Sequence, residues 1–142
     1  MSHSRVITGR EFLALLPGNG GPPPADAAYV TVTRSFLAEY GPQFRNWMID
    51  QGLWKWSTKH DCDDKATLYR AVAGRVMVET PRWLDAESLE IAEIWYACDT
   101  GGAHAINAAV LDDRTVVFVE PQGPEFVTLS AQEQDSIFMR RI

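Results

Sequence analysis

The chain has 142 residues, 46% of them hydrophobic, and a formal net charge of −6. This length is that of one ordinary domain, and its apolar content is sufficient for a core. The acidic balance and the absence of a run of Lys or Arg argue against binding to a nucleic-acid backbone, because such binding depends on clustered positive charge. We therefore expect one folded domain without a nucleic-acid partner.

The sequence also argues against a membrane protein. No apolar stretch is long enough to span a bilayer, and the first residues lack the pattern of a secretory signal. We therefore predict a cytoplasmic protein without a membrane partner. Because disulfides are rare in that compartment, Cys62 and Cys98 are expected to be free thiols.

The first residues predict a short helix followed by a linker. Thr8 and Glu11 fit a capping box, and apolar residues follow directly, so a helix is expected over about 9–16. The Pro- and Gly-rich segment 17–24 can neither continue that helix nor join a central strand. Residues 1–28 are therefore predicted to form an N-terminal arm that docks on a main domain of residues 29–142.

The next part of the chain predicts helices. After a short strand at 29–33, apolar residues recur at spacings of three and four between Phe36 and Met48, which indicates a helix with a possible break at Gly41–Pro42. A second amphipathic helix is expected over about 62–78.

From Ile91 onward the apolar period shortens to two, which is typical of strands. The expected strands cover about 91–98, 103–111, 115–120 and 136–141. Helices followed by strands predict an α+β fold in which N-terminal helices pack on a C-terminal antiparallel sheet.

Cys62 is the first candidate for chemistry, because it lies at the start of the second predicted helix. Unsatisfied N–H groups and the helix dipole favour a thiolate there. Asp61, Asp63 and Asp64 oppose this effect, since nearby negative charges disfavour another anion. An imidazolium or a bound cation would have to offset them. The alternative is that Cys62 is a small buried hydrophobe and that the aspartates are a solvated helix start.

Strand parity predicts that His104 and Glu120 lie together. Both continue apolar rows, and a three-residue loop at 112–114 would place these rows on one side of a hairpin. Ile106 then opposes Glu120, with His104 diagonal to it, so that the carboxylate can orient the imidazole. Together with Cys62 these residues would form a set for nucleophilic catalysis. The alternatives are a turn-marking His104 and a solvent-facing Glu120.

Other side chains could complete such a site. Trp54 and Trp56 are candidate walls of a substrate groove, although packing in the core and at its rim is the preferred explanation. Gln122 could donate to an oxyanion or form a turn. Calcium could bind the three aspartates together with Glu120. A zinc site has no supporting spacing among the residues that could build it, which are His60, Cys62, Cys98 and His104. Cys98 is interpreted as packing.

Three short motifs carry a resemblance to a known family. Asp61-Cys62-Asp63-Asp64, the segment 102–107 and the segment 119–122 together resemble the papain-like cysteine protease domain of the Marasmius oreades agglutinin-type chimerolectins and related phage and bacterial proteins. The resemblance covers residues 29–142. It implies a reduced papain-like fold, and it implies no carbohydrate binding, because no β-trefoil-like repeat precedes the domain.

The resemblance also implies roles for particular residues. Cys62, His104 and Glu120 would form a catalytic triad, and Gln122 would take a polar active-site position. Calcium or manganese would bind Asp63 and Asp64, with Asp61 as a weaker match. Lys65 departs from the aromatic or aliphatic residue expected at that position.

The function predicted from these observations is a metal-assisted cysteine hydrolase, a peptidase that acts on a peptide or protein substrate. The alternative is a non-catalytic module that binds a protein or peptide on the same fold. A structural or assembly protein is the third interpretation, in which the arm at 1–28 would swap onto a partner in a homodimer.

Overall fold

The computed structural model describes residues 5–78 and 88–142. The helices are α1 (Gly9–Leu15), α2 (Arg34–Asp50), α3 (Cys62–Val78) and α4 (Ala131–Asp135). The strands are β1 (Val6–Thr8), β2 (Ala28–Val30), β3 (Ser88–Leu89), β4 (Ile91–Ala97), β5 (Ala103–Val110), β6 (Val116–Glu120), β7 (Glu125–Val127) and β8 (Met139–Arg141). This content confirms the predicted α+β class.

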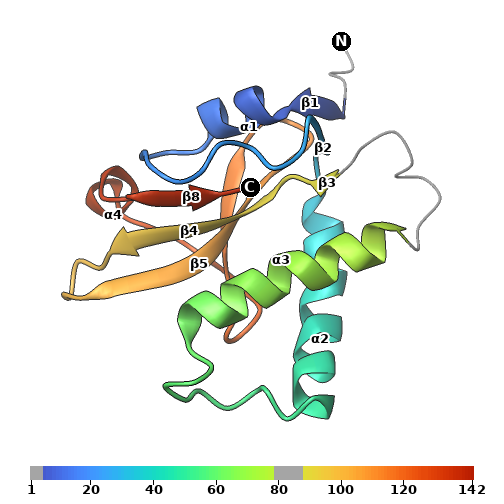
Figure 1. The fold of residues 1–142 in the computed structure, drawn as a ribbon, viewed down its shortest axis with the longest axis vertical. Helices are drawn as coiled ribbons and strands as arrows, with labels where there is room; N and C mark the ends of the chain where they lie inside the picture. The colour runs from blue at the N-terminus through green and yellow to red at the C-terminus, as the bar shows by residue number, and fades with distance from the viewer. Residues whose placement is uncertain (1–4, 79–87) are drawn as a thin grey trace.

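The strands form two sheets. A five-stranded antiparallel sheet has the order β7-β6-β5-β4-β8, and a small sheet has the order β1-β2-β3. Helices α2 and α3 lie on one side of the larger sheet, while α1 and the segment after it lie on the other (Figure 1). The large sheet is therefore a central layer between two covering layers.

Alternate residues of the central strands enter two separate cores. On the α2 and α3 side, Ile91, Ala109 and Val119 pack with helix residues such as Tyr69 and Phe44. The alternate residues of the same strands face away from α2 and α3, and they pack with the N-terminal segment. These include Ala92, Ile94, Ile106, Ala108 and Phe118. Because side chains alternate across a strand, burial on both faces produces nearly continuous apolar runs.

Two helices test the boundaries expected from the sequence. Helix α3 covers Cys62–Val78, as predicted. Helix α2 is continuous across Gly41–Pro42, so the predicted break is wrong. The glycine has a packing role instead, because a Cβ at Gly41 would lie 3.0 Å from the carbonyl oxygen of Pro124. Burial of the α2 face that includes Leu37, Phe44 and Met48 outweighs the local helix-breaking tendency.

The central strands agree with the sequence, but β1, β3 and β7 were not predicted, and the strand expected at 29–33 is the shorter β2. Strands β4, β5 and β6 lie within one residue of their predicted bounds. The expected strand at 136–141 is shortened to β8, and α4 precedes it. Ser130 and Glu133 form a capping box at the start of α4, with Glu133 N–H donating to Ser130 Oγ at 3.0 Å. This local signal explains the extra helical turn.

The N-terminal segment packs against the rest of the molecule. The predicted capping box is present, with Thr8 N–H donating to Glu11 Oε2 at 2.7 Å. Phe12 is fully buried, and its ring meets Tyr29 edge to face at 5.2 Å. Strand β1 pairs with β2, so this segment belongs to the small sheet and to the second core.

The Gly-rich segment after α1 runs along β8. Gly20 and Gly21 have positive φ angles, and a Cβ on either would overlap the backbone carbonyls of Phe138 and Arg140. Arg140 also donates from Nη1 to the carbonyl of Leu13 at 3.0 Å. The segment that was predicted to be a linker therefore lies in close backbone contact with this strand.

A membrane-spanning helix is not found in residues 5–78 and 88–142, because no helix there is both sufficiently long and sufficiently apolar.

Glu90 generates a prediction about stability. Its side chain is 0% exposed at the β3–β4 junction, and neither carboxyl oxygen has a hydrogen-bond partner among the described residues. Burial raises its pKa from 4.5 to about 8, against the opposing effect of Arg114. The folded state therefore favours the protonated acid, and the unfolded state releases the proton at lower pH.

The free energy of unfolding should consequently fall by a few kcal/mol as pH rises from about 5 to about 8. Denaturant unfolding across this range measures the loss, and Glu90→Gln should flatten it because the amide does not titrate. An identical pH dependence in the variant would contradict an ionisable, buried Glu90.

Candidate functional site

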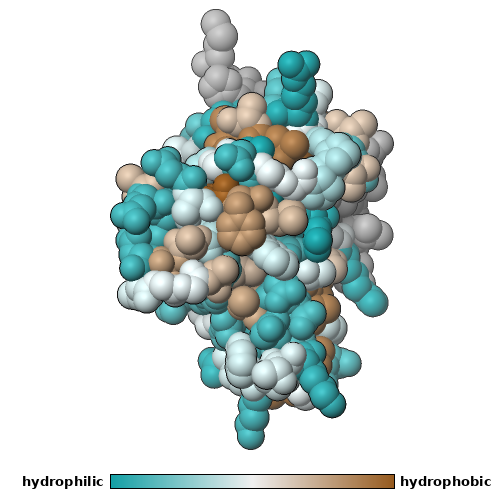
Figure 2. Space-filling view, turned by 60° about the vertical axis from the view of Figure 1, so that its left-hand side comes forward, coloured by the Kyte–Doolittle hydropathy of each residue, from teal (hydrophilic) through white to brown (hydrophobic). Residues whose placement is uncertain are grey.

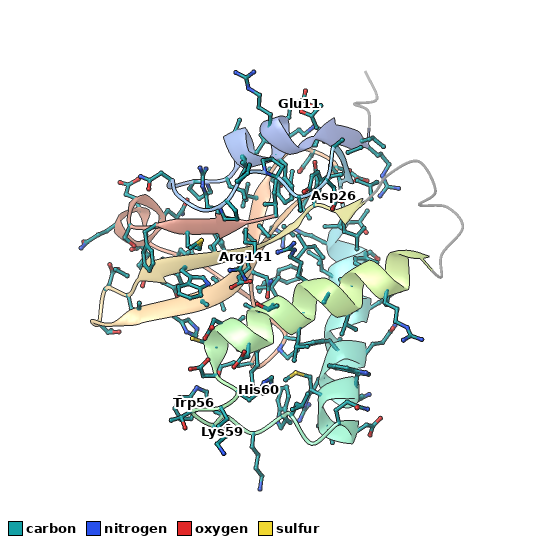
Figure 3. The ribbon with its side chains drawn as sticks, viewed as in Figure 1. Glu11, Asp26, Trp56, Lys59, His60 and Arg141 are labelled. Carbon is teal, nitrogen blue, oxygen red and sulfur yellow. The ribbon has the colours of Figure 1, made fainter. Side chains whose placement is uncertain are left out.

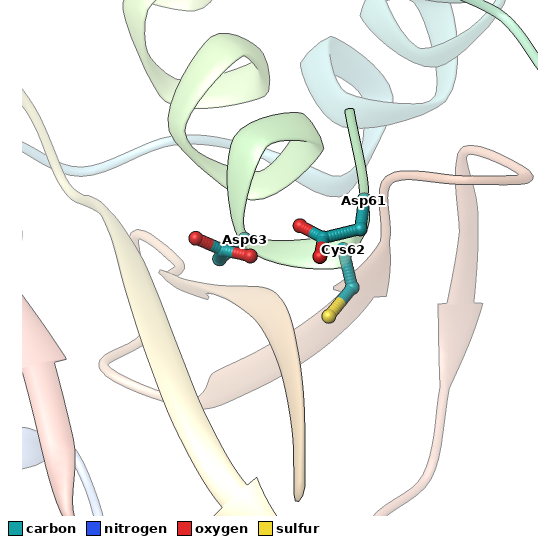
Figure 4. Close-up of side chains that lie close together, drawn as sticks. All are labelled: Asp61, Cys62 and Asp63. Carbon is teal, nitrogen blue, oxygen red and sulfur yellow. The ribbon is translucent and has the colours of Figure 1, made fainter. Parts of the chain in front are cut away.

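A small pocket forms where the start of α3 meets the start of β5. Its lining residues, which come from α3, β4 and β5, are Cys62, Asp63, Trp95, Ala103, His104 and Ala105, and its volume is about 180 Å³. The predicted Cys62 and His104 therefore line one cavity. Figure 4 shows the Cys62 sulfur pointing away from α3, whereas the carboxylates of Asp61 and Asp63 face each other.

His104 and Glu120 form a close pair. His104 Nε2 lies 2.6 Å from Glu120 Oε2, and the two side chains are 23% and 20% exposed. The β5–β6 register places Ala108 opposite Phe118. Leu111 N–H donates to the Thr115 carbonyl at 2.9 Å, which leaves residues 112–114 as the three-residue loop that strand parity predicted. Arg114, the last residue of this loop, has a φ of 71°, which is the left-handed conformation that a three-residue hairpin loop uses. The sequence-based geometry of this hairpin is therefore confirmed.

Gln122 joins this pair through its backbone. Its N–H donates to Glu120 Oε1 at 3.0 Å, so both oxygens of the Glu120 carboxylate have partners. The ring of Tyr96 meets the His104 ring edge to face, with centroids 6.0 Å apart. These contacts fix the orientation of the imidazole, and Nδ1 is the ring nitrogen that does not bind Glu120.

The surroundings of Cys62 favour a protonated thiol. Burial raises its pKa, and the negative charges of Asp61 and Asp63 raise it further. The backbone N–H of Ala105 has the opposite effect but does not outweigh them. Since the thiolate is the nucleophilic form, the pocket does not favour the activated cysteine that a hydrolase requires.

Asp61, Cys62 and Asp63 form a cluster with metal-ligating atoms within 4.8 Å of one another. The pKa of Asp63 is raised, first by a hydrogen bond with the Asp61 side chain and then by burial and nearby negative charge. Two carboxylates suit a hard cation, whereas a thiol does not. Asp64 is outside this cluster, and its Oδ2 accepts from the Asp61 N–H at 3.4 Å.

The structure does not bring Trp54 or Trp56 into the pocket. Trp54 lines a separate cavity, and the guanidinium of Arg45 lies 5.2 Å above its ring. Trp56 is 59% exposed and lies with His60 in the connection between α2 and α3 (Figure 3). Lys65 is buried and donates from Nζ to the Trp54 carbonyl at 3.0 Å.

Trp95 is the aromatic wall of the pocket, and it was missed in the sequence analysis. It lies opposite Ala105 in the β4–β5 register and lines the cavity with Cys62 and His104. The alternation of side chains along β4 gives the face on which Trp95 lies. The sequence does not show that α3 begins over the same face, so the contact with the pocket could not be predicted. Cys98 is partly buried against the second core, in agreement with its interpretation as packing.

The chain was compared with known proteins and structures. No family model and no curated protein matches it. The solved structures with a similar fold include the PSL1a–E64 complex, and Polyporus squamosus lectin bound to the human-type influenza-binding epitope Neu5Acα2-6Galβ1-4GlcNAc. Both are 22% identical to this chain, with TM-scores of 0.72 and 0.69. Each match covers 98% of this chain and 50% of the other, so the chain spans about half the length of these lectin chains.

These matches correct several predictions. The similar structures are those of a lectin, so the predicted membership in a papain-like cysteine protease family is wrong. The predicted cysteine hydrolase or peptidase function is contradicted by the same finding, as is the alternative of a peptide-binding module. Burial and the charges of Asp61 and Asp63 agree with this correction, because they raise the pKa of Cys62 and so disfavour the thiolate that a cysteine hydrolase needs.

The raised pKa of Cys62 predicts its reactivity. Alkylation by iodoacetamide should reach its half-maximal rate at a higher pH than for an ordinary cysteine, because only the thiolate reacts. Asp61→Asn should lower that pH by removing one negative charge. Intact-mass measurement in a Cys98→Ala background follows Cys62 alone. Rapid alkylation at about pH 6 in the parent chain would contradict the protonated resting state.

The acidic cluster predicts a response to hard cations. Calcium or manganese at about ten times its dissociation constant should stabilise the fold by about 1 kcal/mol, because it relieves repulsion between Asp61 and Asp63. Thermal unfolding with and without each ion measures this effect. The double change Asp61→Asn and Asp63→Asn should abolish it, whereas Asp64→Asn should retain it. An equal response in both variants would remove the cluster as the binding site.

Proposed function

We propose that this chain is a carbohydrate-binding domain, with the sugar held in the pocket formed by Cys62, Asp63, Trp95 and His104. The observation that carries the proposal is the likeness of nearly the whole chain to half of a lectin whose solved structure contains a bound trisaccharide. Carbohydrate thus replaces the peptide or protein partner expected from the sequence.

The chemistry of the pocket supports this proposal. Trp95 offers an amphipathic aromatic ring, and Asp63 offers acceptor oxygens beside it. His104 is held by Glu120 through Nε2, so its Nδ1 can exchange a hydrogen bond with a hydroxyl group. One apolar wall with a few placed polar groups is the usual composition of a small-molecule site.

The protonated thiol of Cys62 suits a pocket that binds a saccharide without reacting with it. A protonated Cys62 is a weak donor and a small apolar surface, which can contact a ligand without reacting with it. Glu120 and the Gln122 backbone then serve to orient His104 toward the ligand. Cys62, His104, Glu120 and Gln122 thus remain site residues under this proposal, with binding and orienting roles.

Direct binding measurements test this function. The isolated chain should bind the trisaccharide Neu5Acα2-6Galβ1-4GlcNAc in calorimetry, and Trp95→Ala should weaken binding at least about tenfold because the aromatic wall is lost. Trp56→Ala is the matched control, since that exposed tryptophan does not line the pocket, and it should change affinity less than about twofold.

A glycan array extends the test to other saccharides, which matters because the chain corresponds to only half of the lectin. An array without any bound glycan would contradict the proposed function.

E64 is a second ligand to be tested at this pocket, because one of the similar structures is the PSL1a–E64 complex. Incubation with E64 followed by intact-mass measurement separates two roles of Cys62. An unchanged mass is expected of a thiol that only lines a binding pocket. A mass increase that is lost in Cys62→Ala would show a reactive thiol and overturn the binding-only role.

A further inference from the structure

The carboxylate of Glu93 is a buried charge with three partners. It is 0% exposed on β4 and lies on the face covered by α3. Its Oε1 accepts from Trp95 Nε1 at 2.7 Å, and its Oε2 accepts from Thr67 Oγ1 at 2.8 Å. Arg141 Nη1 reaches Oε2 from β8 at 3.3 Å (Figure 3). A buried carboxylate is stable only with such partners.

These bonds connect three separate elements to one indole ring. Thr67 belongs to α3, Glu93 and Trp95 to β4, and Arg141 to β8. Arg70 strengthens the connection, because its Nη1 donates to the Arg141 carbonyl at 3.4 Å. Since Glu93 and Trp95 are two residues apart on a strand, both side chains lie on the same face of the sheet. The Trp95 ring cannot turn without breaking its bond to this carboxylate.

A second contact holds the same ring. Phe138 meets the Trp95 ring edge to face, with centroids 6.3 Å apart, and its N–H donates to the Trp95 carbonyl at 3.0 Å. Phe138 is 46% exposed, so this contact lies at the surface. The face of the molecule in Figure 2 has hydrophobic side chains surrounded by hydrophilic ones. The indole is thus held by a buried carboxylate and by an exposed aromatic neighbour.

We propose that Glu93 is a positioning residue for the ligand pocket, and that it acts by fixing the orientation of the Trp95 ring that lines this pocket. The saccharide part of the inference rests on the proposed function. Glu93 itself does not line the pocket, so its effect on a ligand must pass through Trp95.

A double-mutant cycle tests this route. Glu93→Ala should weaken binding of the trisaccharide about tenfold in the parent chain and less than about twofold in a Trp95→Ala background. Glu90→Ala is the matched control, since it removes another fully buried glutamate whose carboxyl oxygens make no hydrogen bond to Trp95, and it should leave affinity unchanged. Equal weakening by Glu93→Ala in both backgrounds would overturn the positioning role.

Hydrogen exchange of the Trp95 indole N–H provides a readout that needs no ligand. The exchange rate, measured by NMR with assignment through Trp95→Phe, should rise at least about tenfold in Glu93→Ala and remain unchanged in Glu90→Ala. An unchanged rate in Glu93→Ala would overturn the inference even if sugar binds.

The two measurements separate the proposals. A chain that binds no saccharide but shows the expected exchange retains the positioning of Trp95 and loses the carbohydrate function. If Glu93→Ala does not fold, Glu93→Gln keeps the side-chain volume and replaces a charge-assisted hydrogen bond by a weaker one, so the same effects should appear at about threefold. Their absence in a folded Glu93→Gln would count against the inference.

Discussion

The burial of β4 and β5 on both faces is the constraint on which the rest of this structure depends. One parity of these strands meets α2 and α3, and the other meets the N-terminal segment. A change of pairing by one residue would move every side chain to the wrong core. The register is therefore strongly determined, and it fixes the positions of the polar side chains at the candidate site as well as those of the apolar side chains in the cores. His104 and Trp95, on opposite parities, lie at the end of this strand pair where covering layers leave a pocket.

Several elements could be predicted because their signals are local. The extent of α3 followed from its apolar spacing, and the β5–β6 hairpin followed from parity and a short loop. Strand parity and the short loop were also sufficient to predict that His104 lies beside Glu120. In contrast, the continuity of α2 depends on packing between Gly41 and Pro124, which are far apart in sequence. Trp95 was missed for the same reason, since its role depends on where α3 crosses the sheet.

The function was harder to predict than the fold because the same residues support different chemistry in different surroundings. A cysteine, a histidine and a glutamate are together in space, as expected, yet burial and two aspartates favour a neutral thiol. Residue types and spacing do not report this balance, which depends on solvent access around Cys62. The likeness to half of a lectin chain likewise lies in the fold, at an identity of 22%.

The close approach of Gly20 and Gly21 to β8 has a consequence for association between molecules. Strand β8 is one edge of the five-stranded sheet, and an uncovered edge offers unpaired backbone groups to another chain. The two glycines let the backbone of an earlier segment lie directly against Phe138 and Arg140, which covers this edge. A larger side chain at either glycine would push this segment away from β8. The edge strand would then offer its unpaired backbone groups to another chain. The Gly-rich stretch is therefore both the connection between α1 and β2 and the cover of an edge strand.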